Sequence, residues 1–250
     1  MCGVPYHSAE GYIAKLVQKG YKIAICEQVE DPKKAKGLVQ REIVRRVTPG
    51  TVVEASMLDE NRNNFLGCVY AVQGHIGVCF ADITTGEVYA TGSDNWQDIA
   101  SELGRFGPRE VLVGGMAATA DSFTAFLRER LEALIEPMPE ESFDAQRAAE
   151  RIIRHFRIED FDAAGLTDLP QTIQCLGGLL DYLEQTQQAS LAALNHLQVY
   201  HQGQYMELDL IARRNLELCE TMRTKEKKGT LLWVLDRTRT AMGSRLIRQW

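Results

Sequence analysis

The sequence lacks the features of several large classes of protein. No apolar run approaches the roughly 20 residues that a membrane-spanning helix needs. The N-terminus lacks the basic-then-apolar order of a secretory signal peptide. No Gly-Lys dipeptide occurs, so the chain carries no P-loop for a nucleotide. The five histidines are scattered, with no His-x-x-x-His pair to suggest a metal site. We therefore expect a cytoplasmic protein that has no membrane segment and no cofactor or metal in this chain.

Cysteine is present but unpaired in pattern. No Cys-x-x-Cys motif and no metal-like cluster occurs among the six cysteines, which predicts reduced thiols, most of them buried. They are Cys2, Cys26, Cys68, Cys79, Cys175 and Cys219.

Lysine is missing from the middle of the chain. Residues 53–190 carry nine arginines and no lysine against 23 acidic residues. Residues 1–52 carry nine basic and five acidic residues, and residues 191–250 carry ten and six. A polyanion such as DNA would be attracted to both ends and repelled by the middle. Charge differences between solvated faces are the plainer explanation of the same numbers.

The first fifty residues predict a helix followed by two strands. Residues 8–19 read as an amphipathic helix with Ser8 as its cap and Gly20 as its stop. Residues 21–29 are apolar and β-prone, typical of a mostly buried strand. A polar loop over 30–37 leads to a second strand at 39–47, which a Pro-Gly turn ends.

The middle of the chain predicts an α/β layer with a mixed sheet, because three hairpin strands precede alternating helices and strands. The expected strands are 65–72, 75–83, 86–92 and 110–113, and the expected helices are 96–106, 121–134, 144–156 and 171–187. The pairs Gly114-Gly115 and Gly177-Gly178 indicate turns or close packing.

The last sixty residues lose the strand pattern. Apart from an extended piece over 199–208, they predict helices at 210–222, 231–238 and 241–250. The last helix places Met242, Leu246, Ile247 and Trp250 on one face and has no C-terminal cap. We therefore expect the chain to stop inside a helix.

Long, non-repetitive strings near both ends of this chain are more specific than any short motif. At the N-terminal end they are Cys2-Gly3-Val4-Pro5-Tyr6-His7, Cys26-Glu27-Gln28-Val29-Glu30-Asp31-Pro32 and Arg41-Glu42-Ile43-Val44-Arg45-Arg46-Val47-Thr48-Pro49-Gly50. At the other end they are Met206-Glu207-Leu208-Asp209, Gly229-Thr230-Leu231-Leu232-Trp233 and Thr240-Ala241-Met242-Gly243-Ser244-Arg245. Together these strings resemble the MutS family of DNA mismatch repair proteins.

The resemblance implies an α/β multidomain fold. Residues 1–52 would be the distal half of a mixed α/β mismatch-recognition domain, which the chain enters partway through. Residues 53–190 would be a connector domain of ribonuclease-H-like fold, and residues 191–250 the beginning of an all-helical core. The match is strongest at 1–52 and 206–250 and rests mainly on element order between them.

A basic loop and strand are the first candidate DNA site. Lys33, Lys34 and Lys36 lie in the loop, and Arg41, Arg45 and Arg46 lie in the strand. On an alternating strand Arg41 and Arg45 would share one face and Arg46 would take the other. Such cations can neutralise phosphates without reading bases. A solvated surface is the alternative, but the resemblance favours contact with the DNA backbone.

The string Pro5-Tyr6-His7-Ser8 is the second candidate DNA site. A helix start can hold a phosphate, and an aromatic ring can stack on a sugar or base. The alternative is that Tyr6 packs as a hydrophobic staple while Ser8 only caps the helix.

The family's reader of mismatches is missing. MutS proteins insert the Phe of a Phe-x-Glu motif beside the mismatch, and none of the eight phenylalanines here has Glu two residues later. We therefore expect backbone contact without mismatch discrimination, and no enzymatic activity in this chain. The full-length family implies a DNA-dependent ATPase that uses ATP and Mg²⁺, forms homodimers, associates with the nucleoid and binds mismatched duplex DNA and a MutL-type partner.

Two alternative functions stay open. One is a protein-interaction module without DNA binding, for which Arg147, Arg151 and Arg154 form a candidate helix face. The other is a divalent-metal nuclease, because ribonuclease-H-like folds often hold two metal ions between carboxylates. For Asp82 the following Thr-Thr-Gly makes a turn cap the simpler role. The pool of candidate ligands is Asp82, Glu87, Asp94, Asp98, Glu102 and Asp144.

Overall fold

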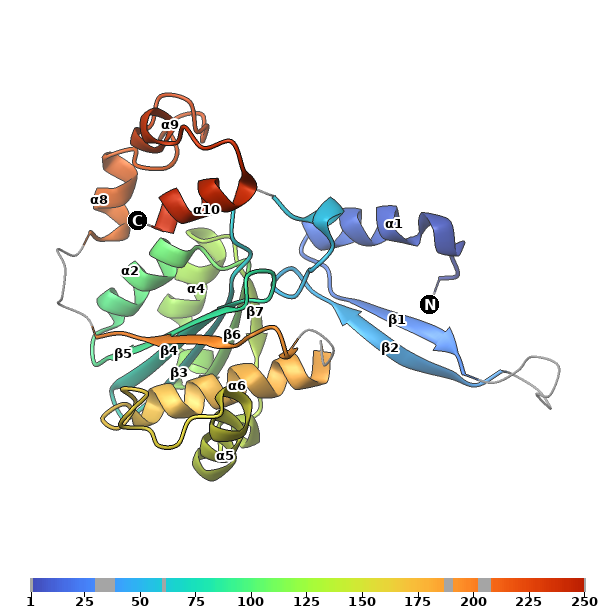
Figure 1. The fold of residues 1–250 in the computed structure, drawn as a ribbon, viewed down its shortest axis with the longest axis horizontal. Coiled ribbons are helices and arrows are strands. Elements are labelled where there is room, and N and C mark those ends of the chain that lie inside the picture. The colour runs from blue at the N-terminus through green and yellow to red at the C-terminus, as the bar shows by residue number, and fades with distance from the viewer. Residues whose placement is uncertain (1, 30–38, 60–61, 187–190, 202–207, 250) are drawn as a thin grey trace.

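The computed structural model describes residues 2–29, 39–59, 62–186, 191–201 and 208–249. They form three parts, which we call the N-terminal unit (residues 2–59), the sheet domain (62–201) and the helical segment (208–249). Figure 1 shows the N-terminal unit projecting to one side of the sheet domain and the helical segment lying above it.

The N-terminal unit is a helix packed on a two-stranded antiparallel ribbon. Val17, Val47 and Val52 are its buried hydrophobic residues. With so small a core, the unit depends on its contacts with the sheet domain. Its elements are α1 (Tyr6–Gln18), β1 (Ile23–Gln28), β2 (Arg41–Val47) and the short 3₁₀ helix η1 (Ala55–Met57).

The first helix begins two residues earlier than the sequence predicts. Pro5 occupies the N-cap position with φ of −61° and ψ of 139°, so the proline ring already fixes the entry to the helix. The hydroxyl of Ser8 donates to the carbonyl of Pro5 at 3.0 Å and does not cap a backbone N–H. The prediction of Ser8 as the cap is therefore wrong.

The prediction of a mostly buried first strand is also wrong. In β1 only Ile23 and Ile25 are half-buried, and the remaining residues are exposed. The physical reason is that α1 covers one face of the ribbon, and the other face meets solvent along most of its length.

The sheet domain holds a six-stranded mixed sheet, which confirms the predicted α/β class. The strand order is β7-β6-β3-β4-β5-β8. Strand β4 is antiparallel to both β3 and β5, whereas the pairs β3–β6, β6–β7 and β5–β8 are parallel. The strands are β3 (Leu66–Val72), β4 (His75–Asp82), β5 (Glu87–Ser93), β6 (Glu110–Gly115), β7 (Leu134–Pro137) and β8 (His196–Val199).

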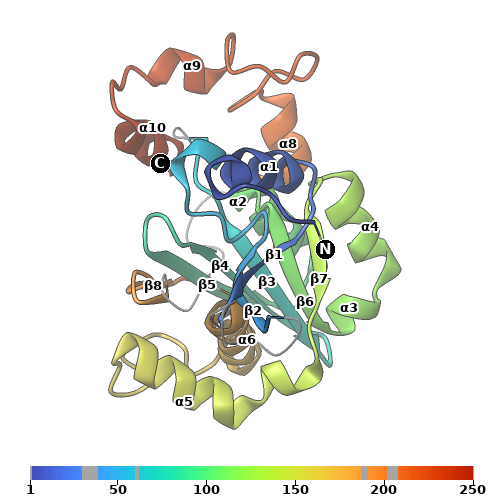
Figure 2. The ribbon, with the colours of Figure 1, turned by 90° about the vertical axis from the view of Figure 1, so that its right-hand side faces the viewer.

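Helices cover both faces of this sheet, so its central strands are apolar on both sides (Figure 2). One face packs on α5 (Ala145–Phe156) and α6 (Pro170–Thr186), which follow the 3₁₀ helix η2 (Glu140–Phe143). The other face packs on α2 (Trp96–Phe106), α3 (Met116–Thr119) and α4 (Asp121–Glu129). Along β3, Cys68 and Tyr70 face α6, whereas Val69 and Ala71 face the other layer.

Two predicted elements of this region differ in the structure. The expected helix over 121–134 ends at Glu129, and Leu134–Pro137 forms an edge strand instead. Glu132 has φ of 53°, which breaks the helix, and pairing with β6 stabilises the strand. The expected extended piece at 199–208 is β8 at His196–Val199, while residues 202–207 lie outside the described residues.

Close packing explains the paired glycines. The ring of Phe143 is stacked on Tyr70 with centroids 4.4 Å apart, and it also abuts Gly114 and Gly178. A Cβ at Gly114 would lie 2.1 Å from the Phe143 ring, and one at Gly178 would lie 2.5 Å from it. The ring therefore requires glycine on both sides, as the close-packing interpretation predicts.

The helical segment is confirmed as helical, with shorter helices than predicted. Its helices are α8 (Leu210–Asn215), α9 (Leu231–Leu235) and α10 (Ala241–Gln249). The expected helix over 210–222 stops early because Glu217 has φ of 48°. Asp236 ends α9 in an extended conformation and accepts a hydrogen bond from the Ser244 hydroxyl of α10 at 2.7 Å.

All six cysteines are free, as predicted, but only Cys68, Cys79 and Cys175 are buried. These three thiols lie where α6 packs on β3 and β4. Within the described ranges no helix has the length and apolar character needed to cross a membrane.

The packing of Phe143 predicts the effect of a single methyl group. Replacing Gly178 by Ala should lower the free energy of unfolding by about 1–3 kcal/mol, because the Phe143 ring has no room to move away. Urea denaturation measures this change. Gly11→Ala is the matched control, since Gly11 lies in α1 with nothing within 4 Å, and there we expect a gain of about 0.5–1 kcal/mol. Equal effects of the two variants would contradict this account.

Candidate nucleic-acid interface

A β-bulge sets which arginines of the ribbon share a face. Opposite Cys26 lies Ile43, but opposite Ile25 lies Arg45, so β2 holds one extra residue, Val44, between these two pairs. An extra residue shifts the alternation of side chains by one position. Residues on either side of the bulge therefore do not follow simple alternation.

The predicted pairing of Arg41 with Arg45 on one face is wrong for this reason. Directly opposed residues of an antiparallel pair project to the same face. Arg45 pairs with Ile25 and lies on the inner face, which packs toward α1. Arg46 pairs with Ala24 and Arg41 with Gln28, and alternation along β1 puts both arginines on the outer face.

On the inner face Arg45 is committed to an ion pair within the chain. Its guanidinium contacts the carboxylate of Glu54, and both side chains are partly buried. The pair ties β2 to the segment that leads into η1. Arg45 is therefore held on the inner face and is not among the residues that the outer face offers to a ligand.

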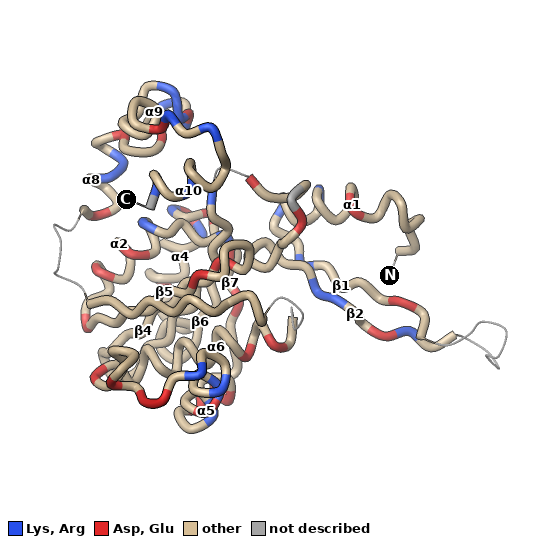
Figure 3. Tube along the Cα trace, viewed as in Figure 1, with Lys and Arg blue, Asp and Glu red and all other residues tan. Residues whose placement is uncertain are grey.

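The outer face combines cationic and apolar side chains. Arg41 and Arg46 flank Ile43, whose side chain is 53% exposed although it lies in a strand. Figure 3 shows the basic residues of β2 on the projecting ribbon, away from the acidic residues of the sheet domain. Lys33, Lys34 and Lys36, which complete the predicted basic group, lie outside the described residues.

The second candidate site lies at the start of α1. Tyr6 is 92% exposed, so it does not pack as a hydrophobic staple, and Pro5 and His7 are exposed beside it. The hydroxyl of Ser8 is bonded to the carbonyl of Pro5. Because α1 covers the inner face of the ribbon, the structure does not gather this string and the Arg41–Arg46 face on one side.

A buried carboxylate that sequence reasoning missed joins the N-terminal unit to the sheet domain. Glu110, at the start of β6, is fully buried. Its Oε2 accepts hydrogen bonds from the Thr48 hydroxyl at 2.5 Å and from the Gly50 N–H at 3.0 Å. Its Oε1 accepts from the Tyr182 hydroxyl of α6 at 2.8 Å, and Lys22 Nζ lies 3.7 Å away. Burial and the nearby Glu110 carboxylate raise the pKa of Tyr182 above its ordinary value.

A second buried carboxylate lies at the same end of the sheet. Asp82 ends β4, and its Oδ1 accepts from the N–H and hydroxyl of Thr84 at 2.9 and 2.6 Å. Its Oδ2 accepts from the N–H of Asn64 at 3.1 Å. The predicted turn cap is thus confirmed. The Asn64 side chain donates to the carbonyl of Pro49 at 3.0 Å, and Arg245 of α10 donates to Thr84 Oγ1 at 3.4 Å.

The remaining candidate metal ligands are dispersed among local partners. In the part of the chain that the structure describes, no three His, Cys, Asp or Glu side chains converge on a possible metal position. The partners are His75 for Asp94, Ser93 and Asn95 for Asp98, Tyr200 for Glu102, Thr85 for Glu87 and the Arg147 N–H for Asp144. This arrangement offers no carboxylate cluster for a two-metal nuclease.

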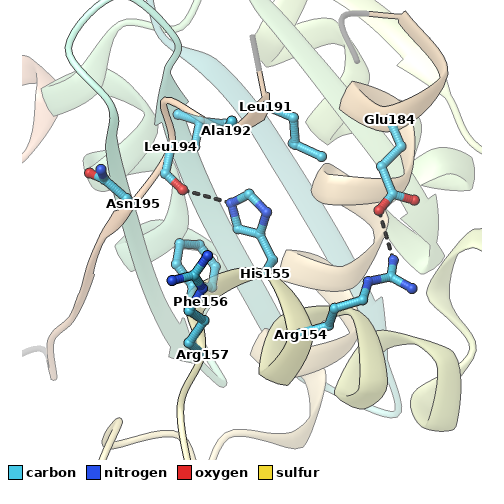
Figure 4. Close-up of a pocket in the computed structure, with 9 residues that line it drawn as sticks. All are labelled: Arg154, His155, Phe156, Arg157, Glu184, Leu191, Ala192, Leu194 and Asn195. Atoms are coloured by element: carbon cyan, nitrogen blue, oxygen red, sulfur yellow. Dashed lines mark hydrogen bonds and ion pairs between the residues drawn. The ribbon is translucent and has the colours of Figure 1, made fainter. Parts of the chain in front are cut away.

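The arginines of α5 lead to a cavity of about 500 Å³ beside α6 (Figure 4). Arg151 does not belong to a free face, since it binds Asp181 at 2.7 Å and Glu184 at 3.1 Å. Arg154 binds Glu184 at 3.0 Å and, with the exposed Arg157, lines the cavity. His155 Nε2 lies 2.6 Å from the Leu194 carbonyl, which can only accept its N–H.

Known proteins match this chain along its whole length. Family models named MutS domain I, MutS domain II and MutS domain III match residues 1–56, 64–198 and 211–250. The DNA mismatch repair protein MutS of Bacillus subtilis is 46% identical over the full chain, that of Symbiobacterium thermophilum 44%, and that of Lachnoclostridium phytofermentans 43%. The chain spans 27–29% of the length of these relatives.

The hydrogen bonds of Asp82 predict a structural effect of its amide analogue. Asp82→Asn should lower the free energy of unfolding by about 1–3 kcal/mol, because an amide nitrogen would face the buried donors of Asn64 or Thr84. Asp94→Asn is the control at an exposed position, with an expected change within about 0.5 kcal/mol. Urea unfolding with and without Mg²⁺ measures both. A Mg²⁺-dependent gain in wild-type stability that Asp82→Asn abolishes would instead support a metal site.

Proposed function

The chain belongs to the MutS family of DNA mismatch repair proteins, and on that premise we propose that its ribbon grips the DNA backbone without reading sequence. The observation that carries this proposal is the outer face of the ribbon, where Arg41 and Arg46 flank an exposed Ile43. Guanidinium groups bind phosphate oxygens bidentately, which fixes a protein on a duplex but conveys no sequence information.

Two further groups would extend this contact. The loop lysines Lys33 and Lys36 lie in the sequence between the two strands of the ribbon and add to its positive charge. The string Pro5, Tyr6, His7 and Ser8 offers an exposed ring and a helix start on the other side of the ribbon, so it would meet a different part of the duplex.

The activity of the full-length protein is part of the same proposal. It would bind mismatched double-stranded DNA as a homodimer in the cytoplasm, associated with the nucleoid. It would couple this binding to hydrolysis of ATP with Mg²⁺. The present chain has no P-loop sequence and no Phe-x-Glu motif, so both nucleotide chemistry and mismatch reading would depend on residues other than these 250.

The salt dependence of DNA binding tests the backbone grip. Titration of a fluorescent duplex, matched or with one mismatch, should give the same affinity for both and a steep decrease with salt. Replacing both Arg41 and Arg46 by glutamine should reduce the slope of the logarithm of the DNA-binding constant against the logarithm of the salt concentration by about 2. Each phosphate contact contributes about 0.9 to that slope. The matched control is Arg45→Gln, which should leave the slope unchanged because Arg45 lies on the inner face, against Glu54.

Two other outcomes would each contradict part of this proposal. A flattened slope in Arg45→Gln with an unchanged slope in the double variant would contradict the assignment of faces. A preference for the mismatched duplex would show that recognition lies in this chain without the Phe-x-Glu motif.

A second candidate role is contact with a MutL-type repair protein, and the cavity beside α5 favours it. Arg157 and the Arg154–Glu184 ion pair line the cavity with Leu191 and Leu194, so charged and apolar side chains meet there. Such a combination suits an acidic or amphipathic segment of a partner protein. This role needs no DNA and corresponds to the interaction-module alternative.

Charge reversal tests the partner contact. The double variant Arg154→Glu, Arg157→Glu should weaken binding to a MutL-type protein at least tenfold, since like charges at an interface cost on the order of several kcal/mol. Arg128→Glu, on α4 and on the opposite side of the sheet, is the control and should bind normally. Surface plasmon resonance without DNA measures the affinity, and equal binding by both variants would exclude the cavity as the contact.

A further inference from the structure

Three separate parts of the chain meet at one end of the mixed sheet. Leu66, at the start of β3, is opposite Ala81 in β4 and opposite Glu110 in β6. The two buried carboxylates Asp82 and Glu110 therefore flank the start of the central strand. We call this region the junction and define it by Thr48, Pro49, Gly50, Asn64, Asp82, Thr84, Glu110, Tyr182 and Arg245.

The N-terminal unit is held at the junction by its turn after β2. Thr48 and Gly50 donate to Glu110, and Pro49 accepts from Asn64. The turn approaches closely, since a Cβ at Gly50 would lie 2.9 Å from both the Glu110 Cβ and the Leu66 Cδ1. Just before β1, Lys22 adds an ion pair with Glu136 of β7. Both ends of the ribbon nearest the sheet are thereby attached to it.

The charge of Glu110 is what this arrangement requires. Three donors, from Thr48, Gly50 and Tyr182, point at its two oxygens, and a carboxylate is the side chain that only accepts. Buried hydrogen bonds to a charged acceptor are strong, and loss of any partner leaves a group unsatisfied. An amide of the same shape would present N–H to one set of donors.

The helical segment reaches the same junction through Asp82. The Thr84 hydroxyl donates to Asp82 and accepts from Arg245 of α10. Asn64 donates its N–H to Asp82 and its side chain to Pro49. A continuous set of hydrogen bonds therefore runs from the turn of the ribbon, through Asn64 and Asp82, to α10.

We infer that Glu110 is a positioning residue, which sets the orientation of the ribbon on the sheet domain, while Asp82 joins the same hydrogen-bond network to α10. Rigid placement matters because the ribbon has little core of its own and is joined to the sheet domain by residues 53–63 alone in the sequence. The inference rests on the proposed function only in giving the ribbon a ligand to grip. The positioning itself is a property of the free protein.

Distance measurements between spin labels test the positioning directly. Cys26 is exposed on the outer face of the ribbon, and Glu129→Cys would add an exposed site on α4, in a background of Cys2→Ser and Cys219→Ser. The three buried thiols would remain unlabelled in the folded protein. As the internal control, labels at Glu129→Cys and Glu150→Cys, with Cys26→Ser, report a distance within the sheet domain.

Thr48→Val and Thr48→Ser form the decisive pair of variants. Valine keeps the volume of threonine and removes the hydroxyl that donates to Glu110, whereas serine retains it. We expect Thr48→Val and Glu110→Gln to broaden the ribbon-to-sheet distance distribution, while Thr48→Ser and the control distance keep the wild-type width. Hydrogen exchange of the β1 and β2 amides should quicken about tenfold or more in the first two variants, with β3 and β4 unchanged.

Each result decides the inference without reference to DNA. A wild-type distance distribution in Thr48→Val and Glu110→Gln would overturn it, and so would equal broadening in Thr48→Ser. If the wild-type chain failed to bind a duplex, the proposed function would fall while the distance measurement still decided the positioning. If it binds, Glu110→Gln should lower affinity several-fold with an unchanged salt slope, because the phosphate contacts remain but are misplaced.

Discussion

The buried carboxylate of Glu110 is the constraint on which the arrangement of this protein depends. A carboxylate that is buried away from water is stable only when its oxygens accept hydrogen bonds. Here the donors come from the N-terminal unit and from α6. The sheet domain cannot satisfy Glu110 by itself, since two of its three donors belong to the turn that follows the ribbon. Docking of the two parts and burial of the charge are therefore one event.

Hydrogen bonds also engage the candidate metal ligands of the sheet domain. Each carboxylate of the candidate pool has a hydroxyl, a backbone N–H, an amide or a histidine as its partner. These contacts cap turns and helices or hold neighbouring segments together. The acidic character of this domain directs a polyanion to the two basic ends of the chain, of which the ribbon is one (Figure 3).

The ribbon shows how one residue changes a functional prediction. Alternation alone puts Arg41 and Arg45 on one face, but the extra residue Val44 moves Arg45 to the inner side, where Glu54 neutralises it. Nothing in the sequence of β2 marks the bulge, because it arises from pairing with β1. The choice of which arginines meet a ligand thus depends on register and not on composition.

The sequence by itself determined the family, the α/β class of the sheet domain and the type of most elements. Long strings, hydrophobic periodicity and glycine positions are local properties, so each can be recognised from the order of residues alone. Tertiary structure alone decided that Leu134–Pro137 is a strand and that Glu110 and Asp82 lie at one junction. It also decided that the ribbon is exposed on its outer face. These features depend on which segments pair with and cover one another. The contacts that decide this, such as the hydrogen bonds of Glu110, join residues sixty or more positions apart in the sequence.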